Sequence, residues 1–190
     1  MNMRTKLTVI ALATLPFAGT LAAQETKPFD AGIAWSFPTD NLKEVTNASG
    51  GYAGFNLDLG YNTHLVGTTV PLRLSLGFND FPGMNNQGVT RSLSGIQAAG
   101  DIFIATGIKN LSIVTGASIN RWTEKITPTP AGYSDHVKGT KFGARFGAEY
   151  QVNALCSVNA LLQVVELGTD PNATKGFNPS WIQVGVKYHF

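Results

Sequence analysis

The chain has 190 residues, of which 21 are glycine and only 14% are charged, and its formal net charge is +2. A typical soluble domain has roughly 25% charged residues and about 7% glycine. The composition therefore argues against an ordinary soluble domain, and the nearly balanced charge gives no reason to expect a nucleic-acid partner.

Residues 1–23 have the pattern of a secretory signal peptide. Two basic residues precede an apolar run that ends in the small residues Ala22 and Ala23 before Gln24. The run is shorter than the roughly 20 apolar residues of a transmembrane helix. Cleavage after Ala23 would leave residues 24–190 as one domain, whose single cysteine, Cys156, cannot form an intrachain disulfide.

Eight segments of the remaining chain alternate apolar and polar residues, which is the pattern of β-strands. In residues 140–151, for example, Phe142 and Phe146 have one parity, and Arg145 and Glu149 have the other. The expected strands comprise residues 29–37, 50–61, 69–78, 92–104, 111–122, 140–151, 155–165 and 180–190.

The connections between these strands alternate in length. Long polar connections span residues 38–49, 79–91, 123–139 and 166–179, and short ones join the other neighbouring strands. The sheet is therefore antiparallel, with every long loop at one end. Each segment is close to the roughly 9–11 residues that cross a bilayer at a tilt. We predict an all-β, eight-stranded antiparallel up-and-down transmembrane β-barrel with four long outer loops and three short periplasmic turns.

The last strand carries the most specific pattern, an unbroken apolar row of one parity: Ile182, Val184, Val186, Tyr188 and Phe190. This row resembles the closing strand of Gram-negative outer-membrane β-barrels, and the whole pattern is similar to the small OmpX, OmpA transmembrane-domain and OmpW-like barrels. The resemblance implies an integral outer-membrane protein with periplasmic termini, and an assembly signal in this row. It also implies contacts with outer-membrane lipid and lipopolysaccharide, and with the barrel-assembly machinery and periplasmic chaperones during biogenesis.

The two faces of the strands differ in a way that places the apolar face against lipid. The polar face is mostly small residues with few charges, which suits a narrow lumen, whereas a soluble lipocalin-like barrel would turn a more charged face to water. Aromatic residues gather at both ends of the apolar face, as membrane interfaces favour. They are Trp35, Phe37, Phe55, Phe78 and Phe142 toward the long loops, and Tyr61, Tyr150, Tyr188 and Phe190 toward the turns.

Six charged residues have the parity of the lumen. A turn at residues 62–68 would place Asp58 nearly opposite Arg73, as a cross-strand ion pair. Because buried charges must be paired, the main interpretation is a plug of salt bridges, and a polar path or gate for ions is the alternative. The six residues are Asp58, Arg73, Asp101, Arg145, Glu149 and Lys187.

The pattern leaves the function open. The main hypothesis is a structural or surface-interaction barrel whose loops contact an unknown ligand. The alternative is a narrow pore for small or apolar solutes, although no hydrophobic row is evident in the lumen. A lipid A-modifying enzyme would need a His, Ser and acid arrangement, and His64, His136 and His189 do not provide one: they lie in a turn, in a loop and beside the terminus, with no serine two residues after His189. We therefore expect no catalysis, no cofactor and no metal site.

Overall fold

The computed structural model describes residues 27–39, 42, 53–83, 85–86, 88–128, 136–165 and 179–190. The expected signal peptide lies outside these residues, as do most of the first and fourth long loops. No helix among the described residues is long and apolar enough to cross a membrane.

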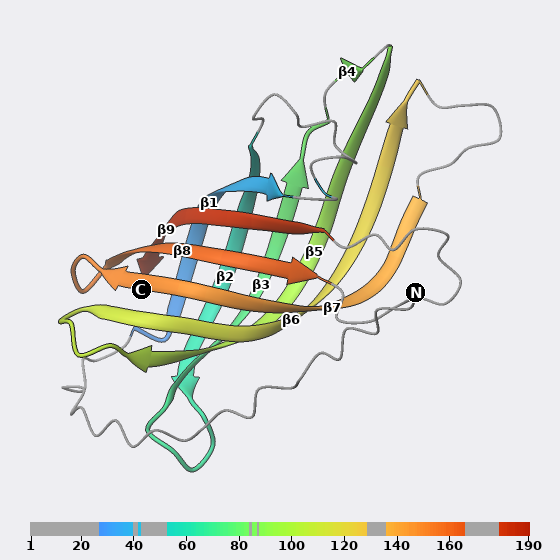
Figure 1. Cartoon of the computed structure of the whole chain (residues 1–190). Helices are drawn as coiled ribbons and strands as arrows, with labels where there is room; N and C mark the ends of the chain where they lie inside the picture. Colours follow the sequence, from blue (N-terminus) through green and yellow to red (C-terminus); the bar gives the residue numbers. More distant parts are fainter. Residues whose placement is uncertain are drawn as a thin grey trace, which may run out of the picture.

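The described chain forms an antiparallel β-barrel, so the predicted fold is confirmed (Figure 1). The strands are β1 (Phe29–Thr39), β2 (Gly54–His64), β3 (Pro71–Phe81), β4 (Asn85–Asn86), β5 (Val89–Ala105), β6 (Leu111–Thr127), β7 (His136–Gln151), β8 (Cys156–Val165) and β9 (Ser180–His189). They follow one another in the sheet as β3-β2-β1-β9-β8-β7-β6-β5, and pairing of β3 with β5 closes the ring. The two-residue β4 only adds to the outer end of β5.

The last strand lies beside the first. β9 pairs with β1 along ten residues, from His189 opposite Asp30 to Ser180 opposite Thr39. The Phe190 N–H also donates a hydrogen bond of 2.9 Å to the carbonyl oxygen of Phe29. Neither strand therefore leaves an open edge, which would be costly in lipid.

The apolar face points outward, as predicted. Among the expected aromatic residues, the exposed fraction runs from 39% at Phe55 to 66% at Phe142. The inward positions are instead mostly Asn, Gln, Ser, Gly and charged residues. A barrel with this arrangement suits a membrane, because lipid replaces the missing apolar core around the outer wall.

Glycines on the inner face leave room for large side chains on the neighbouring strand. Gly95 lies opposite Trp122, and a Cβ atom on Gly95 would come 2.5 Å from the indole ring. Gly116 lies opposite Asp101, where a Cβ atom would come 2.2 Å from a carboxylate oxygen. The abundance of glycine thus reflects the narrowness of the lumen.

The second long loop was predicted too long. β3 continues to Phe81 and β5 begins at Val89, so much of residues 79–91 belongs to strands. The prediction was wrong because this segment lacks the alternation of apolar residues on which the strand assignment relied.

The third long loop is also shorter than predicted, because β6 continues to Thr127 and β7 begins at His136. β5, β6 and β7 have 17, 17 and 16 residues, well above the roughly 9–11 that cross a bilayer. Figure 1 shows their outer halves rising past the neighbouring strands. These three strands therefore project from the end of the barrel that carries the long connections.

The short turns lie at the opposite end, together with the C-terminus (Figure 1). The turn between β2 and β3 is closed by a hydrogen bond of 2.9 Å from the Leu65 N–H to the carbonyl oxygen of Val70. The His189 N–H donates to the carbonyl oxygen of Leu155, in the turn before β8. The chain thus ends at the rim formed by the turns.

Candidate functional site: the filled lumen

The interior of the barrel has three layers, which can be followed along the inner face of β9. From the projecting end toward the turns, this face carries Trp181, Gln183 and Lys187, and each is at most 3% exposed. Each of these residues belongs to a layer that side chains of other strands complete: Trp181 to an aromatic cap, Gln183 to an amide layer and Lys187 to an ionic layer.

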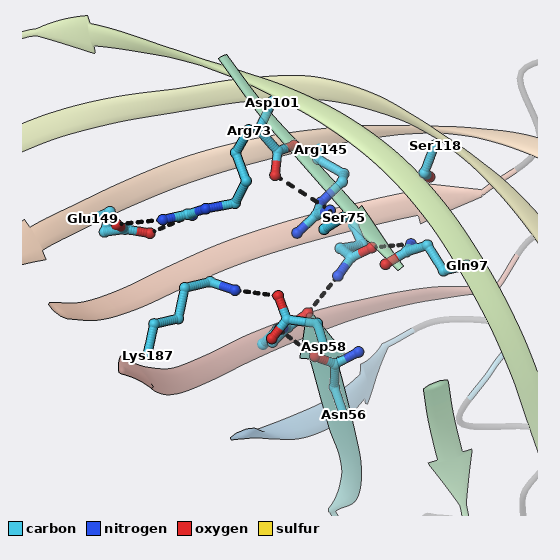
Figure 2. Close-up of polar contacts among 12 residues, drawn as sticks. Asn56, Asp58, Arg73, Ser75, Gln97, Asp101, Ser118, Arg145, Glu149 and Lys187 are labelled. Carbon is cyan, nitrogen blue, oxygen red and sulfur yellow. Dashed lines mark hydrogen bonds and ion pairs between the residues drawn. The ribbon is translucent and has the colours of Figure 1, made fainter. Parts of the chain in front are cut away.

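Arg73 is the centre of the ionic layer. Its Nη1 and Nη2 atoms donate to the two carboxylate oxygens of Glu149, at 2.7 and 2.9 Å, and its Nε lies 2.9 Å from Asp30 (Figure 2 shows the pair with Glu149). The guanidinium carbon also lies 4.7 Å from the centre of the Phe103 ring, a cation–π contact. This bidentate contact with Glu149 requires a guanidinium group and would not be reproduced by lysine.

Two further cations complete the ionic layer. Lys187 is paired with Asp58, and its Nζ also lies 3.6 Å from Asp30. Arg145 is 3.3 Å from Asp101, and Figure 2 shows both pairs inside the barrel. All six charged residues expected in the lumen thus lie there. Asp30, a seventh charge that the sequence analysis did not include, links the Arg73 and Lys187 pairs, whereas Arg145 and Asp101 form a separate pair.

The expected ion pair between Asp58 and Arg73 does not form. β2 continues to His64, and the turn falls near Gly67, which has a φ of 73°. The register therefore places Asn62 opposite Arg73, and Asp58 lies opposite Gly77. The pairing was predicted wrongly because the turn begins later than expected, and each residue of delay moves the partners further apart.

The amide layer is a continuous chain of side-chain hydrogen bonds across six strands. Gln97 donates to Gln163 at 2.6 Å and to Asn120 at 2.8 Å, which ties β5 to β8 and β6. Gln183 donates to Asn56 at 3.0 Å. The full chain consists of Asn79, Asn56, Gln183, Gln163, Gln97, Asn120 and Ser118. Because Gln163 connects opposite parts of the ring, this layer crosses the lumen.

The aromatic cap closes the lumen at the projecting end. The rings of Trp122 and Trp181 meet edge to face, with centroids 5.4 Å apart, and Phe81 lies 5.6 Å from Trp181. These apolar side chains are at most 1% exposed: Leu42, Phe81, Leu93, Trp122, Val165 and Trp181. No hydrophobic row was evident in the lumen from the sequence, and these side chains form an apolar cluster at this end.

His189 has a serine neighbour that the sequence did not suggest. Its Nε2 lies 2.9 Å from the hydroxyl oxygen of Ser157, on β8. Glu149 lies near both residues, so a serine, a histidine and an acid are close together. Ser157 is fully buried, however. An acyl substrate in the membrane therefore has no access to its hydroxyl group.

Parity alone could have found the inward residues that were missed. Asp30 has the parity of Ser36, Trp122 that of Asn120, and Trp181 that of Lys187. Trp122 and Trp181 were overlooked because tryptophan is expected at the lipid interface rather than inside a polar lumen. By contrast, no groups of three or more possible metal ligands occur among the residues that the structure describes.

Residues 7–190 match the family described as the outer membrane protein beta-barrel domain. The chain belongs to this family. It is an integral outer-membrane β-barrel protein, in agreement with the outward apolar face and the closed sheet. A comparison with curated protein sequences gave no significant match.

Solved structures of small outer-membrane barrels have the same fold. Neisserial surface protein A is similar with a TM-score of 0.56 and 17% identity over 85% of this chain and 96% of its own. Ail, the attachment invasion locus protein of Yersinia pestis, matches with a TM-score of 0.54 and 11% identity over the same shares. The outer membrane enzyme PagL matches with a TM-score of 0.52 and 11% identity, over 85% of this chain and 99% of its own. At these identities the likeness concerns the fold alone.

Proposed function

We propose that this protein is a closed surface barrel whose lumen has a structural role and whose projecting end contacts partners outside the cell. The observation that carries the proposal is the filling of the lumen at three successive levels. An eight-stranded barrel has little room beyond its own side chains, and here the aromatic cap, the amide layer and the ionic layer occupy that room. Interaction with partners is then left to the outer rim.

The proposed orientation places the turns and both termini in the periplasm and the projecting strands outside. This follows the usual arrangement of such barrels, in which short turns face the periplasm. The polarity of the outward face supports it, because Arg121 on β6 and Thr140 on β7 lie just beyond Ile119 and Phe142 toward the projecting end. Residues 1–23 would direct export, and the row ending in Phe190 would be read by the assembly machinery.

We also propose that the barrel has no catalytic activity. The buried hydroxyl group of Ser157 supports this, because it lies inside the ring of strands rather than on the lipid-facing side. PagL, a structural neighbour, is an enzyme, so the fold does not decide the matter. The barrel would then bind outer-membrane lipids, lipid A and any surface ligand without converting them chemically.

The single-channel conductance of the refolded barrel in a planar bilayer tests the filled lumen. We expect the wild-type barrel to be silent. We also expect silence from a variant with Trp122→Ala and Trp181→Ala, because the two layers below the aromatic cap remain. The matched control is Trp35→Ala, which removes an outward-facing tryptophan. Steady conductance of the wild type would support a pore instead, and conductance of the double variant alone would make the aromatic cap a gate.

A further inference from the structure

The outward side chains of β5, β6 and β7 change from apolar to polar toward the projecting end, beyond the belt of apolar side chains that faces lipid. Ile119 and Phe142 lie opposite each other on β6 and β7 and are the last large apolar pair. Beyond them the outward positions carry hydroxyl groups and positive charges. This outer polar face consists of Thr90, Ser92, Ser94, Arg121, Thr123, Lys125, Thr127 and Thr140.

The two cations of this face stand at different heights. Arg121 follows Ile119 by two residues and lies between Ile96 and Thr140 on the neighbouring strands. At roughly 3.3 Å per residue, it is about 7 Å along the strand from Ile119, and Lys125 is about 13 Å further out. Arg121 is thus placed at the level of lipid headgroups, and Lys125 lies beyond it, opposite Ser92.

Both cations are available to bind an anion. Arg121 and Lys125 are exposed, and every ion pair found among the described residues lies in the lumen instead. Among the described residues, the nearest acid on the outward face is Asp80, on β3, which is separated from Thr123 by Ser94. The face therefore carries a local excess of positive charge, surrounded by hydroxyl groups.

We propose that the outer polar face binds the phosphorylated sugar headgroup of a glycolipid in the outer leaflet. A guanidinium group at headgroup level matches a phosphate on the first sugars, because arginine binds phosphate with two parallel hydrogen bonds. The threonine and serine hydroxyls can both donate and accept, as sugar hydroxyls require. The apolar belt below would contact the acyl chains. This inference rests on the orientation proposed above and names the lipid partner of that surface.

Binding can be measured by native mass spectrometry of the refolded mature barrel in detergent, titrated with bisphosphorylated lipid A or with lipid A lacking both phosphates. We expect the wild type to prefer the phosphorylated lipid. The double variant Arg121→Gln with Lys125→Gln should bind it about 10- to 30-fold more weakly, because each cation near an anionic surface contributes comparably. Its affinity for the dephosphorylated lipid should not change.

The matched control is Lys27→Gln with Lys109→Gln, which removes two exposed cations from the turn end. It should retain wild-type affinity. The proposal fails if the control loses as much affinity as the double variant, or if the phosphates make no difference. It also fails if inositol hexakisphosphate binds through Arg121 and Lys125 while lipid A does not, because the site would then serve soluble phosphates. Binding in detergent does not depend on orientation, so a wrong orientation would be recognised separately.

Discussion

Arg73 holds several parts of the lumen together, because one side chain neutralises carboxylates on two other strands. Its partners Glu149 and Asp30 belong to β7 and β1, whereas Arg73 itself is on β3. Removing it would leave these buried carboxylates with insufficient positive charge around them. Uncompensated buried charge is among the more damaging changes in a folded protein.

We therefore expect Arg73→Gln to lower the free energy of unfolding by about 3–5 kcal/mol, as is usual when one partner of a buried pair is removed. Urea unfolding in phospholipid vesicles, followed by the heat-dependent shift on gels, would measure it. Lys109→Gln removes an exposed cation in a short turn and is the control, with an expected change within about 0.5 kcal/mol. Equal stabilities of the two variants would mean that the ionic layer contributes little to stability.

At the scale of the element, β9 combines two properties that can be separated. Its backbone closes the barrel against β1, and its outward row has about half of each side chain exposed, for example 51% at Phe190. The ring of Phe190 lies 6.2 Å from that of Phe29 and 6.3 Å from that of Tyr188. About half of its surface therefore remains available to lipid or to another protein.

We expect Phe190→Ala to lower the amount of folded barrel in cells several-fold, while the purified chain still refolds into vesicles. The reason is that, in the proposed role of this row, recognition by the assembly machinery would need the exposed ring, whereas closure needs the backbone. Fractionation of the outer membrane and a gel-shift assay of refolding would give the two readouts. Phe146→Ala, on an outward aromatic of β7, should change neither. A loss of refolding with Phe190→Ala would assign the residue to stability instead.

At the scale of the whole molecule, the orientation can be tested from the two rims. In a Cys156→Ser background, a cysteine is introduced as Lys125→Cys on the projecting strands or as Lys109→Cys in a short turn. A membrane-impermeant maleimide should label only the first in intact cells and both after the membrane is disrupted. Labelling of the turn variant alone in intact cells would reverse the proposed orientation, and with it the leaflet of the glycolipid.

The existence of the strands could be predicted because a two-residue period is imposed wherever lipid covers one face. The outer ends of β5, β6 and β7 could not, because the rule inverts where water replaces lipid. There some inward positions become apolar, as at Leu93 and Trp122, and the outward ones polar, as at Thr123 and Lys125. The strands expected from outward apolar residues are therefore shorter than the observed ones.

The ion pairs were less predictable than the residues that form them. Parity places Asp58, Arg73 and Lys187 inside, but the pairing depends on the register of β2 against β3, which is set by the turn near Gly67. Contacts across the lumen, such as Lys187 with Asp58, join residues far apart in the chain. Alternation within one strand carries no information about them.

The glycines that face large side chains have a consequence for how such a lumen can change over evolutionary time. Gly95 with Trp122, and Gly116 with Asp101, each divide one fixed volume between two strands. Enlarging one member without shrinking the other forces a clash, and shrinking the large member alone leaves a void. In descendants of this chain, we expect the two members of a pair to vary together, with their summed volume more constant than either residue. Selection inside the barrel would then act on the cross-strand pair rather than on either residue alone.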